Sequence, residues 1–240
     1  MLFDTPDMSK TTTNLINNGY WLRTHASIDG VPADCRRIYL ELLNKLTRHF
    51  KVSIDHIIKS RGGAIPVPMT RESIEKYLTG YTFEYRTFCN LREFRSGTEG
   101  YWRRDPNKQT HIIIYYNRCT LRARQQFSQI HELMHFLQTV DEPFLAFFDE
   151  LILNTDLPES VIVKLLERAT EKAVVMYLMP NDFFIKKYEE IEAEAKKFGK
   201  TEVRLLADAF GVSMQSALYR LQECVPQYKS NPLTFENMPP

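Results

Sequence analysis

Apolar residues recur at helical spacing in the first third of the chain. Arg36 to Phe50 carries them three and four positions apart, which predicts an amphipathic helix. A short second helix is expected after Ser53, whose hydroxyl suits an N-cap. Gly62 to Pro68 marks a loop. Thr70 suits the cap of a third helix, which we expect to end at Gly80. The apolar positions of the first two helices are Ile38, Leu42, Leu43, Leu46, Ile54, Ile57 and Ile58.

The pattern changes to that of β-strands after Gly80. Tyr81 to Phe94 is rich in aromatic residues and Thr, and Ile112 to Tyr116 is an unbroken β-branched and aromatic run. Ser96 to Gly100 predicts a turn between these two segments. We therefore expect a small sheet that leads directly into the next helix.

The rest of the chain has helical patterning, so we predict an α+β fold whose C-terminal half is mainly helical. Residues 1–30 are polar and weakly patterned, which indicates a weakly structured arm. We expect a main domain over 31–198, a helical element over 199–225 and a Pro-rich disordered tail over 226–240. The predicted helices of the C-terminal half cover 125–139, 144–153, 158–179 and 182–198, followed by a final pair.

Composition places the chain among ordinary globular proteins. It has 240 residues, of which 43% are hydrophobic and 25% charged. No apolar run approaches the roughly 20 residues of a membrane span, and the first ten residues do not have a signal-peptide pattern. The four cysteines are far apart and form no C-x-x-C motif, which predicts reduced thiols in a cytoplasmic protein. They are Cys35, Cys89, Cys119 and Cys224.

The net charge of +1 conceals two stretches of opposite sign. Residues 86–124 contain nine Lys and Arg against three Asp and Glu, whereas residues 141–194 contain thirteen acidic residues against five basic ones. The basic stretch could line a cleft for an acidic substrate segment. Two solvated faces that partly neutralise each other are the simpler interpretation, which we favour.

An H-E-x-x-H motif, residues 131–135, lies in the predicted helix 125–139. Residues four apart share one face of a helix, so His131 and His135 can both reach a single ion. Zn²⁺ held by two His and a carboxylate keeps a fourth position for water, whose pKa falls to about 7. Glu132 projects to one side and can accept the proton from that water. The motif predicts one zinc per chain, with Glu132 as the general base of a peptidase.

A third metal ligand must lie downstream of the two histidines. Glu167 and Glu171 are four apart in one predicted helix and share a face, so both could reach the metal. Their positions alone do not choose between them. The full set of acidic candidates is Glu142, Asp149, Glu150, Glu167 and Glu171.

Two segments of the chain resemble the ImmA/IrrE-type metallopeptidases, which are cytosolic proteins of bacteria and phages. The family has an approximate R-F-x-x-x-H-E-x-x-H helix and then an E-x-x-A-x-x-F-A-x-x-L-L-M-P helix. Gln126 to His135 resembles the first motif, with Arg124 just upstream, and Asn117 is similar to the family's strand-ending Asn. Glu167 to Pro180 resembles the second motif, and an ungapped count back from Pro180 puts Glu167 at the acidic ligand position.

The resemblance implies a zincin-like fold with zinc held by His131, His135 and Glu167. It further implies a protease or antirepressor that inactivates a helix-turn-helix repressor. The chain departs from the family at several positions: Met134 replaces Gly, and Thr170, Ala173 and Val174 replace A, F and A. About ten extra residues lie between the motifs, around 144–153.

These departures keep a second hypothesis open, namely a non-cleaving antirepressor that acts by binding and whose metal site is structural. In the peptidase hypothesis, the group that stabilises the oxyanion is not identified. Candidates are His111, Tyr115, Tyr116 or a basic side chain from 86–124. Phe144, Phe147 and Phe148 in the additional segment could form a lid, but we expect them in the core.

Leu205 to Ser213 and Ala217 to Leu221 look like a helix-turn-helix, in which Gly211 makes the turn and Ser213 caps the second helix. Residues 201–224 contain two Arg and three acidic residues, a net charge of −1. Duplex binding rests on Lys and Arg contacts to phosphate. We therefore predict a packing or protein-docking module, and we do not expect DNA binding.

Overall fold

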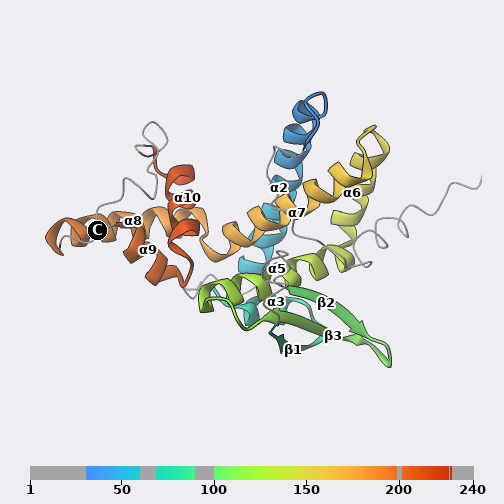
Figure 1. Ribbon diagram of the computed structural model, residues 1–240, viewed down its shortest axis with the longest axis horizontal. Helices are drawn as coiled ribbons and strands as arrows, with labels where there is room; N and C mark the ends of the chain where they lie inside the picture. The colour runs from blue at the N-terminus through green and yellow to red at the C-terminus, as the bar shows by residue number, and fades with distance from the viewer. Residues whose placement is uncertain (1–30, 60–68, 90–99, 199–201, 227, 229–240) are drawn as a thin grey trace, which may run out of the picture.

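The computed structural model describes residues 31–59, 69–89, 100–198, 202–226 and 228. The described residues form eight helices and one three-stranded sheet, which confirms the predicted α+β class (Figure 1). The expected arm 1–30, the loop around Gly62 to Pro68 and nearly all of the tail 226–240 lie outside these residues. The elements are α2 (Arg36–Lys59), α3 (Arg71–Tyr77), β1 (Thr82–Phe88), β2 (Gly100–Asp105), β3 (Lys108–Asn117), α5 (Arg122–Val140), α6 (Glu142–Leu153), α7 (Glu159–Leu178), α8 (Asn181–Phe198), α9 (Glu202–Phe210) and α10 (Met214–Cys224).

The sheet has the order β1-β3-β2, with β3 parallel to β1 and antiparallel to β2. β1 and β3 correspond to the predicted strands, whereas β2 was not predicted as a separate strand. Its two adjacent arginines, Arg103 and Arg104, conceal the alternation of apolar and polar residues. Most of the expected turn 96–100 lies outside the described residues, and Gly100 is already the first residue of β2.

Helix α5 packs against one face of this sheet, between the strands and α7 (Figure 1). Because side chains alternate along a strand, Ile112 and Ile114 point together into the core, where both are fully buried. The ring of Phe136 from α5 makes edge-on contacts with Phe83 and Trp102, with ring centroids 5.7 and 5.2 Å apart. Aromatic packing therefore fixes α5 on the sheet.

Helix α2 is one continuous helix, so the prediction of two helices separated at Ser53 was wrong. The buried side chains of Phe50 and Ile54 continue one apolar face, and no Gly or Pro interrupts the turn between them. The Ser53 hydroxyl donates a hydrogen bond to Asp141 Oδ2 at 3.0 Å, which ties α2 to the end of α5. Ser53 therefore joins two helices instead of capping one.

Helix α3 begins after Thr70 as predicted, although the Thr70 side chain makes no capping hydrogen bond. The helix ends at Tyr77, three residues before Gly80. Gly80 has φ +92°, a left-handed conformation that side chains other than that of Gly rarely adopt. It thus makes the turn into β1 instead of ending the helix directly.

Helix α6 covers residues 144–153, the segment that the sequence resemblance led us to expect as an addition. Phe144 and Phe148 are buried, and Phe144 packs against Phe50 of α2 with ring centroids 4.8 Å apart. The partly buried Phe147 stacks on His49, with ring centroids 4.7 Å apart. These phenylalanines belong to the core, as expected from the sequence.

The C-terminal helices α8, α9 and α10 lie to one side of α7 (Figure 1). Gly211 has φ +63° between α9 and α10, and the Ser213 hydroxyl accepts a hydrogen bond from the backbone N–H of Ser216 at 3.1 Å. The predicted turn and cap are thereby confirmed. Arg220 of α10 is buried, and its Nε donates to the carbonyl of Met179, immediately after α7, at 3.0 Å.

Cys89 and Cys119 form a disulfide, so the expectation that all thiols are reduced is wrong for this pair. The parallel pairing of β1 and β3 places Phe88 opposite Asn117, which brings the residues that follow both strands together. A sequence separation of 30 concealed this proximity. None of the helices among the described residues is long and apolar enough to cross a membrane.

Candidate metal centre

Two histidines of α5 meet one carboxylate of α7 in the interior of the protein. His131 and His135 lie one turn apart on α5, and their Nε2 atoms are 2.9 Å from each other. Glu167 of α7 places Oε2 3.3 Å from His131 Nε2 and Oε1 3.1 Å from His135 Nε2. All three side chains are buried.

The packing of α7 against α5 distinguishes Glu167 from the other acidic candidates. Glu171, one turn later, forms an ion pair with Arg168 of its own helix at 2.8 Å. The group of potential metal ligands found in the described part of the chain consists of His131, His135 and Glu167. It contains none of the other acidic residues considered from the sequence.

Electrostatics keep the carboxylate of this group ionised. Burial alone would raise the pKa of Glu167, but the adjacent imidazoles of His135 and His131 outweigh it and hold that pKa well below its usual range. Burial lowers the pKa of His135, yet the Glu167 carboxylate reverses this effect and the net direction is upward. Glu167 is therefore an anionic carboxylate beside two nitrogen donors.

Glu132, the motif's glutamate, lies against the sheet. Its side chain is buried, and Gly100 at the start of β2 approaches it closely. A Cβ atom on Gly100 would lie 3.2 Å from both Cγ and Oε1 of Glu132, and 3.0 Å from the backbone oxygen of Tyr115. The absence of a side chain at Gly100 thus leaves room for the Glu132 carboxylate. Sequence analysis did not identify this role for Gly100.

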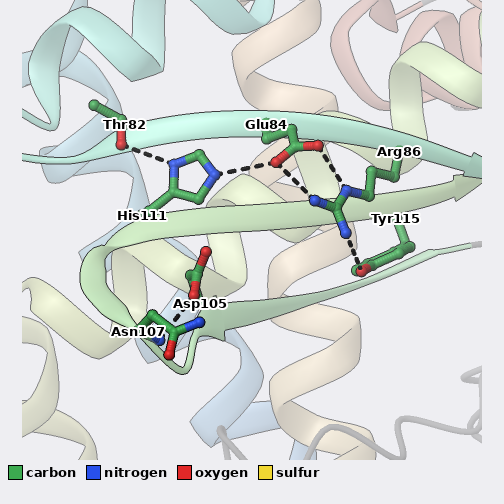
Figure 2. Close-up of polar contacts among 7 residues, drawn as sticks. All are labelled: Thr82, Glu84, Arg86, Asp105, Asn107, His111 and Tyr115. Atoms are coloured by element: carbon green, nitrogen blue, oxygen red, sulfur yellow. Dashed lines mark hydrogen bonds and ion pairs between the residues drawn. The ribbon is translucent and has the colours of Figure 1, made fainter.

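Two of the candidates for oxyanion stabilisation lie on the opposite face of the sheet. His111 and Tyr115 alternate with Ile112 and Ile114, which pack toward α5. Figure 2 shows His111 between Thr82 and Glu84, with hydrogen bonds of 2.9 and 3.1 Å.

Arg86 links Glu84 to the Tyr115 hydroxyl in the same network (Figure 2). The hydrogen bonds from Arg86 and His111 lower the pKa of Glu84 to about 2. This network belongs to the solvent face of the sheet. Tyr116 shares the strand face of Ile112 and Ile114, so it is the one of the three candidates from β3 that points toward the α5 side.

Gln138 and Thr170 form a polar link beside the histidines, and both are buried. Gln138 Oε1 lies 3.3 Å from His135 Nδ1, and Gln138 Nε2 donates to Thr170 Oγ1 at 2.7 Å. Sequence analysis noted Thr170 only as a departure from the family and did not identify Gln138. Their spacing could have indicated the link, because each residue lies three positions after a proposed ligand, His135 or Glu167.

The geometry of the two imidazoles and the carboxylate fits a metal ion. One ligand atom from each of His131, His135 and Glu167 lies within 4.8 Å of the others. Two imidazole nitrogens and one carboxylate oxygen are the ligands of many open zinc sites. These three residues could therefore hold a metal ion between α5 and α7.

A comparison with known families identifies the chain's relatives. Residues 87–222 match the IrrE N-terminal-like domain, peptidase M78, over more than half of the chain. The chain belongs to the peptidase M78 family. The predicted resemblance to ImmA/IrrE-type proteins is thereby confirmed, and the small sheet with its helices agrees with the zincin-like fold of this family. No curated protein matches the chain significantly.

A Mycobacterium tuberculosis transcriptional regulator is one solved structure that this M78 chain resembles, with a TM-score of 0.47 and 10% sequence identity. The aligned region covers 77% of this chain and 51% of the regulator. The chain thus spans about half the length of that protein.

Proposed function

We propose that this member of the peptidase M78 family is a zinc-dependent endopeptidase. The observation that carries the proposal is the buried convergence of His131, His135 and Glu167 beside Glu132. One zinc per chain would be held by the two imidazole Nε2 atoms and the Glu167 carboxylate. When bound, zinc supplies Lewis-acid polarisation of the scissile carbonyl and activation of water.

The residues of this chain have separate tasks in the proposed reaction. Glu132 accepts the proton of the attacking water at its carboxylate and passes it to the leaving amine. Gly100 leaves the space that this carboxylate occupies. His131, His135 and Glu167 keep their position because α5 and α7 pack on each other in the core. Burial of the group strengthens its electrostatic interactions.

The substrate we propose is a helix-turn-helix repressor, whose inactivation relieves repression in the cytoplasm. Membership of the peptidase M78 family supports a protein substrate of this kind. The C-terminal element α9–α10 has a net charge of −1 over residues 201–224, which supports a role in contacts with protein rather than with DNA.

The test uses purified zinc-loaded protein and repressors encoded beside its gene, with cleavage followed by intact-mass spectrometry. We expect defined fragments from the wild type and a loss of roughly 10²–10⁴-fold in rate for Glu132→Gln, because that variant keeps the shape and loses the base. Elemental analysis should find about one zinc per chain in both proteins. Glu171→Gln, which removes a carboxylate outside the site, is the matched control.

A different outcome would favour binding without cleavage. If the wild type leaves the repressor intact yet releases it from its operator, and Glu132→Gln does so equally well, the chain is a non-cleaving antirepressor. A wild type that retains no zinc after supplementation would contradict both the enzyme and the structural metal site.

A further inference from the structure

A chain of hydrogen bonds joins the two helices that carry the proposed metal ligands. It starts at His135 Nδ1 on α5, continues through both ends of the Gln138 amide to Thr170 Oγ1, and ends at the carbonyl of Leu166 on α7. The last two distances are 2.7 and 2.8 Å. His135, Gln138 and Thr170 are each at most 1% exposed, so water does not replace these partners.

The carbonyl of Leu166 sets the direction of the whole chain. A carbonyl oxygen can only accept, so the single hydroxyl proton of Thr170 points to Leu166. Thr170 Oγ1 then presents a lone pair to Gln138, which fixes the NH₂ end of the amide toward Thr170. The remaining end of the amide, Oε1, is an acceptor and faces His135 Nδ1. That nitrogen must therefore carry the hydrogen.

A proton on Nδ1 leaves Nε2 as the nitrogen that can ligate a metal. His135 Nε2 is the atom 2.9 Å from His131 Nε2 and 3.1 Å from Glu167 Oε1, so it is the nitrogen inside the ligand group. Without the hydroxyl of Thr170, the Gln138 amide can turn over and present its NH₂ group to Nδ1. In that arrangement Nδ1 becomes an acceptor, and Nε2 carries the proton and cannot ligate.

We infer that Gln138 and Thr170 are positioning residues that hold His135 in its ligating tautomer and orientation, an inference that rests on the metal binding proposed above. Thr170 occupies the position where the family motif has Ala. The Thr170 hydroxyl therefore accepts a hydrogen bond from Gln138 that an alanine at this position could not accept. The link also joins the turn of α7 that contains Glu167, between Leu166 and Thr170, to the turn of α5 that follows His135, so both ligands share one support.

The test measures zinc affinity by competition with a chromophoric chelator. Thr170→Val keeps the size of the side chain and removes the hydroxyl, and Gln138→Met keeps its length and removes the amide. We expect each to weaken zinc binding by about 10–100-fold, the usual effect of losing a partner of a ligating His. Thr170→Ser restores the hydroxyl and should bind zinc nearly as well as the wild type.

The matched control is Thr47→Val in α2. The Thr47 hydroxyl also donates to the carbonyl four residues earlier, at 2.6 Å, but it has no link to the metal group. This control should leave zinc affinity unchanged although it removes the same kind of helix hydrogen bond. The double variant Gln138→Met with Thr170→Val should be little worse than either single variant, because the two residues act through one path.

A spectroscopic measurement separates positioning from a merely structural role. In zinc-loaded protein labelled with ¹⁵N-His, the His135 Nδ1–H should give a sharp signal in the wild type and in Thr170→Ser. The same signal should be broadened by exchange with water in Gln138→Met. Equal signals in all three proteins would overturn the inference.

The outcomes distinguish this inference from the proposed function. A wild type without zinc affinity contradicts the proposed function itself. Zinc binding by the wild type, together with affinities of folded Thr170→Val and Gln138→Met within twofold of it, overturns only the positioning role. If Thr170→Val does not fold, Gln138→Met and Thr170→Ser still decide the question.

Discussion

At the scale of single residues, the site depends on which side chains lie within reach of the two histidines. Glu167 and Glu171 are one turn apart on α7, yet only Glu167 contacts His131 and His135. Glu171 is held by Arg168 at 2.8 Å instead. We therefore expect the loss of each carboxylate to affect zinc affinity differently.

We expect Glu167→Gln to lower zinc affinity by more than the roughly 10–100-fold that accompanies changes in residues supporting a ligand. Glu171→Gln should have little effect, because its carboxylate lies outside the group. Competitive zinc titration of both variants against the parent protein is the measurement. Loss of zinc from Glu171→Gln with retention by Glu167→Gln would move the third ligand one turn along α7.

Gly100→Ala should slow peptide cleavage while zinc affinity stays unchanged. The new methyl group would lie 3.2 Å from Glu132 Oε1 and would shift the base. A displacement of 1 Å can cost about 100-fold, so we expect a fall in kcat between a few-fold and that value. Glu171→Gln is the control, since its carboxylate pairs with Arg168 outside the ligand group. Equal kcat for both variants would contradict the role of Gly100.

At the scale of elements, the positions of α5, β1 and β3 relative to one another depend on contacts distant in sequence. The disulfide between Cys89 and Cys119 closes the chain between the end of β1 and the segment before α5. It therefore constrains the approach of α5 to the sheet.

Reduction of this disulfide should lower the free energy of unfolding by about 3–4 kcal/mol, the loop-closure contribution expected for a sequence separation of 30. Chemical denaturation with and without a thiol reductant is the measurement. The variant Cys89→Ser with Cys119→Ser should behave like reduced protein and should not respond to the reductant. Cys35→Ser should keep the full response, and an unresponsive wild type would show that the bond does not form.

Local patterns predicted most helices. They also predicted that His131 and His135 share one face of a helix, because spacing within a helix determines which residues lie together. The sequence did not reveal β2 or the pairing of Cys89 with Cys119, since both depend on strands that meet across long separations. The link from Gln138 to Thr170 spans 32 residues and two helices, so no local pattern contains it. Ser53 was misinterpreted because its hydrogen-bond partner lies 88 residues away.

At the scale of the whole molecule, the C-terminal helices are joined to the helix that carries Glu167. Arg220 is buried and donates to Met179 at the end of α7, where a cation also complements the helix dipole. Its second contact is with Glu223 at 2.7 Å. One of the two arginines of residues 201–224 is thus occupied inside the protein, which leaves Arg204 for contacts outside.

We therefore predict that the element 201–224 has no tight, salt-sensitive affinity for duplex DNA. Binding to phosphate backbones weakens with salt in proportion to the number of Lys and Arg contacts, and this element offers almost none. A gel-shift series at several salt concentrations is the measurement. Sub-micromolar binding that weakens steeply with added salt would contradict the prediction, and loss of that binding in Arg204→Ala would locate it in α9.

The link between Gln138 and Thr170 has a consequence for how this chain can diverge. Alanine at 170 would leave the buried Gln138 NH₂ group without its acceptor, at a cost of about 1–3 kcal/mol. A single substitution at either position is therefore disfavoured, whereas a paired substitution can restore packing. Among close relatives, the residues at 138 and 170 should covary: a hydroxyl at 170 should accompany an amide at 138, and an apolar residue at one should accompany an apolar residue at the other.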